Sequence, residues 1–364
     1  MAETSQSLRG PSFLSLPLRA RYGFSPYSRG TLAFPCLLRR STKCEWAWLF
    51  PQFMPISRSH SELSMTPQHI LVLRSGAVGD FILTTPVLAT LRQAYPNAFL
   101  TVAGHPTRTI LAEHLVDERL DIDNAGWAPY FSESGPTDQA LSISRYDLII
   151  NYLPDKDGTL TRNLSNACPG QVISHSPHPP EDGSRHIIDH LLQGLAPLDL
   201  PLKREPNVAV SDANRDAPFA ILHPGSGSLS KNWPLDRYID LGSRLSSQGP
   251  IAWSLGPAED AICEQIERLE HDHTILSGMT LIDLGATIAS APVYVGNDTG
   301  ITHLAAATGT PTVALFGPTD NRIWGPVGSI VRTLTGDAET PTEDRLNQIS
   351  VDEVLNTVNQ LISK

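Results

Sequence analysis

The sequence has little cysteine and no long hydrophobic run. Its four cysteines, Cys36, Cys44, Cys168 and Cys263, form no Cys-x-x-Cys pair, which argues against a disulfide framework or a cysteine metal site and favours a reduced cytoplasmic protein. No stretch approaches the roughly 18–20 apolar residues of a membrane span. We therefore expect neither a membrane-spanning protein nor a disulfide-stabilised secreted domain.

The chain also lacks the basic surface that nucleic acid requires. Charged residues make up 18% of the 364, and the formal net charge is −11. The charge is uneven, because residues 1–64 carry +5 and the remainder −16. An acidic body does not attract a phosphate backbone, so we expect no nucleic-acid partner, and any phosphate must be bound by a few local donors.

Residues 1–64 have no helical or strand periodicity sustained beyond a few positions. Six prolines interrupt them, and they lack the apolar region and cleavage site of a signal peptide. Their Arg and Ser content faintly resembles a transit peptide. Because a strand pattern begins shortly after Met65, we predict that 1–64 is a disordered extension or a segment upstream of the true start.

From residue 65 short apolar runs alternate with amphipathic stretches. The expected strands are 70–74, 99–103, 146–152, 219–223, 251–255, 293–296 and 312–316. The expected helices are 81–95, 107–115, 186–194, 235–247, 259–269, 281–290, a short one from 304 to 308, and 350–362. Near-continuous apolar strands separated by helices indicate parallel sheets that are covered on both faces.

This alternation runs through the chain twice. We predict an N-terminal domain at 65–196, a proline-rich linker at 197–212 and a C-terminal domain at 213–364. The predicted fold class is α/β, with two Rossmann-like domains whose parallel sheets face each other across a cleft. In such sheets the loops after the carboxyl ends of the strands carry the ligand site.

The most informative stretch is 293–303, a β-branched apolar strand that ends in Gly-Asn-Asp-Thr-Gly and leads into a small-residue helix. The first amides of a helix have no internal acceptor and carry partial positive charge, so the turn suits an anion. The carboxylate of Asp298 would repel a phosphate and is better suited to sugar hydroxyls. Phosphate donors and a hydroxyl acceptor in one turn indicate a sugar nucleotide.

A second turn, Ser75-Gly76-Ala77-Val78-Gly79-Asp80, follows the first expected strand. It is neither a dinucleotide fingerprint nor a P-loop, because it lacks the first glycine of Gly-x-Gly-x-x-Gly and the Gly-Lys-Ser/Thr triplet. Asp80 has two interpretations. One is a helix cap, and the other is a general base that faces the cleft and removes a proton from an attacking hydroxyl.

The loop 223–234 contains His-Pro-Gly-Ser-Gly-Ser and then Ser-Lys-Asn-Trp-Pro. Its small residues expose backbone amides, Ser226 adds a hydroxyl, and Lys231 supplies a compact cation just before a helix, which suits a diphosphate. An ordinary flexible loop with a solvated lysine is the alternative. No Asp-x-Asp pair occurs in 213–364, so we expect no metal ion and no cofactor at the phosphates.

Three single residues complete the candidate site. Glu259 could accept from ribose hydroxyls, although a first-turn Glu stabilised by the helix dipole is the alternative. Met279 could pack on a base, although a methionine in the core is the default. His303 lies one helical turn after Thr299 and could contact sugar or phosphate, whereas a lone helical histidine is more often structural.

Together these residues resemble glycosyltransferase family 9, the heptosyltransferases of lipopolysaccharide assembly. The resemblance covers about residue 65 to the C-terminus. It is carried by Gly76–Asp80 with Thr84-Thr85-Pro86, by Ser230–Pro234, by Gly256–Glu259, and by Asn297–His303 continuing to Leu315–Asp320.

The resemblance implies a GT-B fold, an inverting mechanism without metal, ADP-heptose as donor and a glycolipid or oligosaccharide acceptor bound by the N-terminal domain. It implies a cytoplasmic enzyme in peripheral contact with the inner membrane. It assigns Asp80 as catalytic base. The donor residues it implies are Ser226, Lys231, Thr299 and Gly300 for the diphosphate, Glu259 for the ribose, Met279 for the adenine, and Asp298 and His303 for the sugar.

One departure bears on the acceptor. Family members that act on phosphorylated inner-core lipid carry a basic cluster in the N-terminal domain, whereas 121–144 here contains no Lys or Arg. Another glycan acceptor therefore stays open. A sugar-nucleotide-binding protein without turnover and a GT-B-fold epimerase also stay open, and Asp80 discriminates, because a binder needs no carboxylate in the acceptor half.

Overall fold

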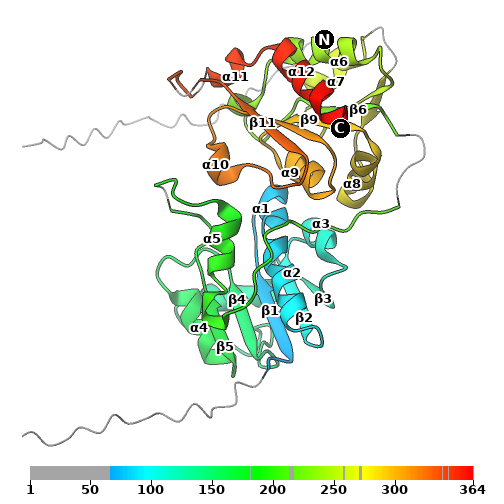
Figure 1. Ribbon diagram of the computed structural model, residues 1–364. Helices are drawn as coiled ribbons and strands as arrows, with labels where there is room; N and C mark the ends of the chain where they lie inside the picture. Colours follow the sequence, from blue (N-terminus) through cyan, green and yellow to red (C-terminus); the bar gives the residue numbers. More distant parts are fainter. Residues whose placement is uncertain are drawn as a thin grey trace, which may run out of the picture. The chain divides into compact units, whose positions relative to one another are not determined.

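The computed structural model describes residues 66–180, 182–212, 217–256, 259–269, 273–337, 339–342 and 344–363. The predictions for 1–64 lie outside these residues. The described part of the chain contains two parallel sheets with helices packed around them (Figure 1). The described part therefore has the α/β architecture that the alternation predicted, and the bounds 65–196, 197–212 and 213–364 stay predictions.

The first half of the chain forms a five-stranded sheet in the order β3-β2-β1-β4-β5. Its strands are β1 His69–Leu73, β2 Phe99–Gly104, β3 Glu118–Asp121, β4 Leu148–Asn151 and β5 Gln171–Ser174. Its helices are α1 Val78–Ile82, α2 Thr85–Ala94, α3 Pro106–Thr109, α4 Thr159–Ala167 and α5 Ile187–Gln193, with the 3-10 turns η1 Ile110–Ala112, η2 Ala125–Phe131 and η3 Ala196–Leu198.

The second half forms a six-stranded sheet in the order β11-β10-β9-β6-β7-β8. Its strands are β6 Ala220–His223, β7 Ile251–Ser254, β8 His273–Leu276, β9 Val293–Asn297, β10 Thr312–Phe316 and β11 Val331–Thr335. Its helices are α6 Leu235–Leu245, α7 Asp260–Ile266, α8 Leu281–Ser290, α9 Gly300–Ala307, α10 Asn321–Trp324, α11 Arg345–Gln348 and α12 Val351–Ile362, with the 3-10 turn η4 Leu229–Lys231.

Both faces of the first sheet are covered, as its continuous apolar strands require. Along β1, Ile70 and Val72 pack into a core that contains α2 and α5, whereas Leu71 and Leu73 pack into a second core with η2 and α4. The first of these cores extends into the second half of the chain and includes residues of β6, α8 and α9. The two sheets therefore share apolar packing.

The structure corrects the helix expected at 81–95, which is two helices. α1 ends at Ile82 and α2 starts at Thr85. Pro86 has no amide hydrogen to continue the helical ladder, and the carbonyl of Ile82 accepts from the Thr85 hydroxyl instead, at 2.7 Å. The turn that carries Asp80 is thus a short separate helix.

The described residues also contain four strands that the sequence pattern did not indicate, β3, β5, β8 and β11. All four lie at the edges of their sheets. Their side chains are partly exposed, whereas every residue of β4, β6, β7, β9 and β10 is buried. An edge strand is covered less completely, so it has a weaker apolar run.

The first turns of α1 and α9 bring the two halves together through two glycines. A Cβ atom built on Gly300 would lie 2.8 Å from the amide nitrogen of Gly79 and 2.8 Å from Cβ of Val78. A Cβ on Gly79 would lie 3.3 Å from Cα of Gly300. Backbone meets backbone here, so only glycine fits at 300 without separating the helices.

Replacing Gly300 with alanine should therefore destabilise the protein by about 1–3 kcal/mol, as overpacking against backbone does. Urea unfolding would measure the change. Gly227→Ala is the matched control, because a Cβ there meets nothing within 4 Å. It should stay within about 0.5 kcal/mol of the unmodified protein. Equal stability of the two variants would show that the α1–α9 contact relaxes at no cost.

Candidate active site

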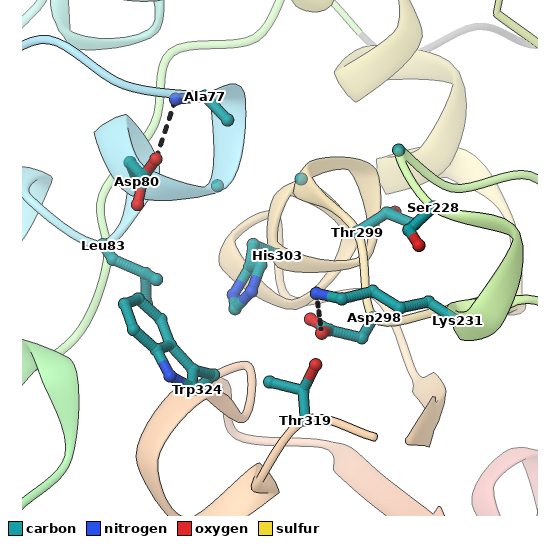
Figure 2. Close-up of a pocket in the computed structure, with 13 residues that line it drawn as sticks. Ala77, Asp80, Leu83, Ser228, Lys231, Asp298, Thr299, His303, Thr319 and Trp324 are labelled. Atoms are coloured by element: carbon teal, nitrogen blue, oxygen red, sulfur yellow. Dashed lines mark hydrogen bonds and ion pairs between the residues drawn. The ribbon is translucent and has the colours of Figure 1, made fainter. Parts of the chain in front are cut away.

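A cavity of about 490 Å³ opens at the α1–α9 contact (Figure 2). The first half contributes the turn after β1, and the second half contributes loops that follow β6, β9 and β10. The lining residues are Ala77, Gly79, Asp80, Leu83, Gly227, Ser228, Lys231, Asp298, Thr299, Gly300, His303, Thr319 and Trp324. Six of the nine predicted site residues are among them, although they come from segments far apart in the sequence.

Asp80 is the third residue of α1, whose N-cap is Ala77, and its role as a base stays a prediction. Its Oδ2 accepts from the amide of Ala77 at 2.8 Å, which caps α1, and its Oδ1 lies 3.4 Å from Nη2 of Arg74. The Asp80 side chain is nevertheless 32% exposed and lines the cavity. A capped and ion-paired carboxylate is held in one orientation, which a base acting on a bound hydroxyl requires.

Arg74, the partner of Asp80, is almost completely buried. Its side chain is 3% exposed, and its Nε has no hydrogen-bond partner among the described residues. Burial lowers the pKa of Arg74, and the nearby Asp80 carboxylate opposes that shift. An arginine stays charged in proteins, so this buried cation stabilises the charge of Asp80 and depends on it in turn.

Asn297, at the end of β9, fixes the loop that carries Lys231. Its Oδ1 accepts from the amide of Trp233 at 3.0 Å and from the hydroxyl of Tyr238 at 3.1 Å. Its Nδ2 donates to the carbonyl of Pro224 at 2.8 Å, and to that of Gly225 at 3.3 Å. The buried side-chain amide of Asn297 thus ties both ends of the loop to β9, the strand that leads into the anion turn, Asp298–Gly300.

Lys231 and Asp298 form an ion pair across the cavity wall, with Nζ 2.6 Å from Oδ2 (Figure 2). The Lys231 side chain is 33% exposed and that of Asp298 is 9% exposed. The ammonium group has three donors, so it can bind a second anion while it keeps Asp298. This pairing offsets the repulsion between Asp298 and a phosphate in the same turn.

Thr299 is the N-cap of α9, which spans Gly300–Ala307 and therefore starts four residues before the helix expected at 304–308. Its hydroxyl accepts from the amide of Thr302 at 3.3 Å. The amides of Gly300 and Ile301 precede that one in the first turn, where helical amides have no acceptor within the helix. They are the natural donors for an anion in the cavity.

His303 is 6% exposed and lies between the two halves. A Cβ on Gly79 would meet its Cδ2 at 3.1 Å, and its Nδ1 has no hydrogen-bond partner among the described residues. Burial lowers the pKa of His303 to about 4, although Asp298 and Asp80 act in the opposite direction. The imidazole is therefore neutral at pH 7 and has hydrogen-bonding capacity left for a ligand.

Comparison with known proteins identifies the family. Residues 192–352 match the model of glycosyltransferase family 9 (heptosyltransferase). Lipopolysaccharide heptosyltransferase 3 of Escherichia coli K12 is 27% identical over 315 residues, which cover 74% of this chain and 89% of that protein. The chain is a family 9 glycosyltransferase.

Solved structures of this family have the same fold. The glycosyltransferase family 9 protein of Veillonella parvula has a TM-score of 0.66 at 18% identity, over 81% of this chain and 97% of that one. E. coli ADP-heptose lipopolysaccharide heptosyltransferase II has a TM-score of 0.65 at 20% identity, over 81% and 98%. The family 9 enzyme described here thus has the GT-B-like pair of parallel-sheet α/β domains.

Three predicted donor residues do not line the cavity. The hydroxyl of Ser226 donates to the carbonyl of Ser228 at 2.5 Å, within its own loop. The Glu259 carboxylate accepts from the amide of Gly256 and lies against Gly225. Met279 is 37% exposed, so the default of a core methionine is wrong. Their roles toward a donor stay predictions.

The cavity also includes residues that the sequence reasoning did not select. Ala77, Gly79 and Thr319 lie inside the segments that carried the resemblance, whereas Gly227 and Ser228 lie elsewhere in the loop 223–234. Leu83 and Trp324 had no signal in the sequence, because nothing in a linear pattern distinguishes a cavity-lining apolar side chain from a core one.

Acidic pairs that resemble metal sites occur only in the first half. Asp121-Ile122-Asp123 and Asp155-Lys156-Asp157 are Asp-x-Asp sequences. Asp155 accepts from the amides of Leu160 and Thr161 at 3.1 and 2.8 Å, which caps α4. Within the described residues no group of three or more His, Cys, Asp or Glu side chains forms a metal-binding cluster.

Asn297→Ala should destabilise this family 9 enzyme by about 2–4 kcal/mol, because it leaves several buried backbone groups without partners. Asn232→Ala is the control, since its Oδ1 already has no partner among the described residues. It should cost less than about 1 kcal/mol. Urea unfolding of both variants measures the difference, and a loss for Asn297→Ala no larger than that of the control would exclude Asn297 as the anchor of the Lys231 loop.

The buried neutral His303 predicts a pH dependence of stability. The unfolded chain takes this proton near the ordinary pKa of about 6.5, and the folded protein only near about 4. Between these values the unfolded state binds more protons, so acidification lowers the unfolding free energy, by at most about 1.4 kcal/mol per pH unit for this residue.

His303→Gln removes that proton site. The variant should therefore lose less stability than the unmodified enzyme between about pH 7 and about pH 5. Histidines other than His186, which interacts with His303, titrate equally in both proteins and cancel in the comparison. Parallel stability curves from urea unfolding would show that His303 has an ordinary pKa in the folded state.

Proposed function

We propose that this family 9 glycosyltransferase transfers heptose from ADP-heptose to a lipopolysaccharide core or a related glycan, with inversion and without a metal ion. The observation that carries the proposal is the cavity that joins Asp80 to the anion turn of Asp298, Thr299 and Gly300. A carboxylate from one half faces cationic donors from the other. A protein that only binds a sugar nucleotide has no use for this arrangement.

The proposed reaction is a single displacement. The acceptor hydroxyl attacks the anomeric carbon of the donor sugar while Asp80 takes its proton. A bond forms between the acceptor oxygen and the anomeric carbon, and the bond from that carbon to the β-phosphate oxygen breaks. ADP leaves with the electron pair, and fixed donors stabilise its charge.

The donor would lie along the second sheet. The diphosphate would be held by Lys231, the first amides of α9 and Ser226. Asp298 would accept hydrogen bonds from sugar hydroxyls, and His303 would accept from them or donate to them. Glu259 would bind the ribose, and the exposed Met279 would pack on the adenine. The relative of known structure that is named ADP-heptose lipopolysaccharide heptosyltransferase II supports this donor.

The proposed acceptor is a glycan with few phosphates. Residues 121–144 contain no Lys or Arg. A second cavity, of about 590 Å³ and next to β4 and β5, is lined by one lysine and no arginine. Tight recognition of phosphates uses several cationic donors. The acceptor would be presented at the inner face of the membrane. In the described parts of the chain, no helix has the length and apolar character of a membrane span.

Asp80→Asn tests the proposed base. Asparagine keeps the size and the acceptor oxygen that cap α1, but it leaves the buried Arg74 without its counter-charge, so the melting temperature should fall while the protein stays folded. It cannot take a proton, so transfer from ADP-heptose to truncated lipopolysaccharide, assayed in excess EDTA, should fall by about 10²–10⁴. ADP binding, measured by calorimetry, should persist because the proposed contacts lie in the second half.

Asp157→Asn is the matched control, since Asp157 also accepts from an amide in the first turn of a helix, that of Thr159 at 3.1 Å, but is not among the residues that line either cavity. Its turnover should stay within about 3-fold of the unmodified enzyme. Near-normal turnover of Asp80→Asn would leave Asp80 as a helix cap and reject it as the base. ADP binding with no transfer to any truncated lipopolysaccharide by the unmodified enzyme would favour a binding protein.

A further inference from the structure

Trp324 introduces a large aromatic ring into a cavity whose other lining side chains, apart from Leu83, are small or polar. It is the last residue of α10, and it is partly exposed. Trp324 packs against the apolar core that includes Leu83, and Figure 2 shows both residues on the side of the cavity where Asp80 lies. Lys231, Ser228 and Thr299 lie on the opposite side, with His303 between the two groups.

This distribution separates two chemistries within one cavity. The charged and amide donors suit a diphosphate, whereas the indole ring on the opposite side suits the apolar C–H face of a sugar ring. The sugar that presents its hydroxyl to Asp80 must lie on the Asp80 side. The apolar wall is therefore on the acceptor side.

We propose that Trp324 is a specificity-determining residue that stacks on the acceptor sugar and directs its hydroxyl to Asp80. The inference rests on the proposed function. It assigns to the donor half a residue that selects the acceptor, so the acceptor sugar would be held between the two halves.

The position of Trp324 is fixed by two local contacts. Before α10, Asp320 accepts from the amide of Arg322 at 2.9 Å and pairs with its guanidinium at 2.6 Å. After α10, the carbonyl of Gly325 accepts from Nε2 of His186 at 3.0 Å. His186 belongs to the first half, where its Nδ1 accepts from the amide of Ile188 and caps α5. Burial lowers the pKa of His186, so the neutral ring can make both bonds.

His186 is thus a positioning residue for Trp324. It connects the cap of α5 in the first half to the turn that carries the indole in the second. Loss of this bond would free the turn without removing the ring. The two residues therefore act through one element, and their effects should not add.

Steady-state kinetics with ADP-heptose and inner-core-truncated lipopolysaccharide tests the assignment. Trp324→Ala should raise the KM for the lipopolysaccharide by about 10–50-fold, and Trp324→Phe by less. The KM for ADP-heptose and its slow hydrolysis by water should stay within about 2-fold, because neither uses the acceptor sugar. Phe99→Ala, which removes a 39% exposed aromatic at the start of β2 and outside the cavity, is the control and should leave both KM values unchanged.

His186→Asn keeps a side chain that caps α5 but is too short to reach Gly325. It should raise the lipopolysaccharide KM by about 3–10-fold, and the double variant should be no worse than Trp324→Ala alone. If the increases in lipopolysaccharide KM of the two single variants combined fully in the double variant, His186 would not act through Trp324. Parallel losses in ADP-heptose hydrolysis and donor KM would move Trp324 to the donor side and overturn the inference.

An unchanged lipopolysaccharide KM in a folded Trp324→Ala variant would also overturn it, while leaving the proposed transfer intact. Failure of the proposed function is recognised separately, because it appears as an absence of transfer by the unmodified enzyme. Without transfer there is no acceptor, so the acceptor role assigned to Trp324 would be rejected together with the proposed function.

Discussion

The site depends on the close approach of two glycines, Gly79 in α1 and Gly300 in α9. Their backbones meet, so the loops that follow β1 and β9 line one cavity. A side chain at 300 would separate them. The apolar core that runs from β1 through α9 to β6 supports this contact from behind. Because of this approach, Asp80 and the anion turn line the same cavity.

Four residues of the Gly-Asn-Asp-Thr-Gly turn each have a separate role in the site. Asn297 ties the Lys231 loop to β9, and Asp298 pairs with Lys231 itself. Thr299 caps α9, and Gly300, which has no side chain, leaves room for α1 to pack against α9. Side chains that would bind a sugar nucleotide are thus held by neighbours in the same five-residue segment. A change at one position reaches the others through hydrogen bonds rather than through the ligand alone.

The sequence predicted the central strands well because they are buried on both faces. β1, β6, β9 and β10 appear as continuous apolar runs, and such runs have one stable environment, the middle of a covered parallel sheet. The edge strands β3, β5, β8 and β11 were missed for the complementary reason. Half of their surroundings are solvent or loops, so tertiary pairing decides their conformation where periodicity does not. The break between α1 and α2 depends on Pro86, whose missing amide hydrogen is visible in the sequence.

The sequence alone determined the fold class, the family and the chemical character of the loops, because glycines, caps and apolar runs act over a few residues. It selected Asp80, Lys231, Asp298, Thr299, Gly300 and His303, which the tertiary structure brings into one cavity. Only the tertiary structure decided that Lys231 pairs with Asp298, that Asn297 is an anchor, and that Met279 is exposed. It alone revealed Trp324 and His186, since their positions depend on contacts between residues more than a hundred positions apart. Contacts of that range leave no local pattern in a single sequence.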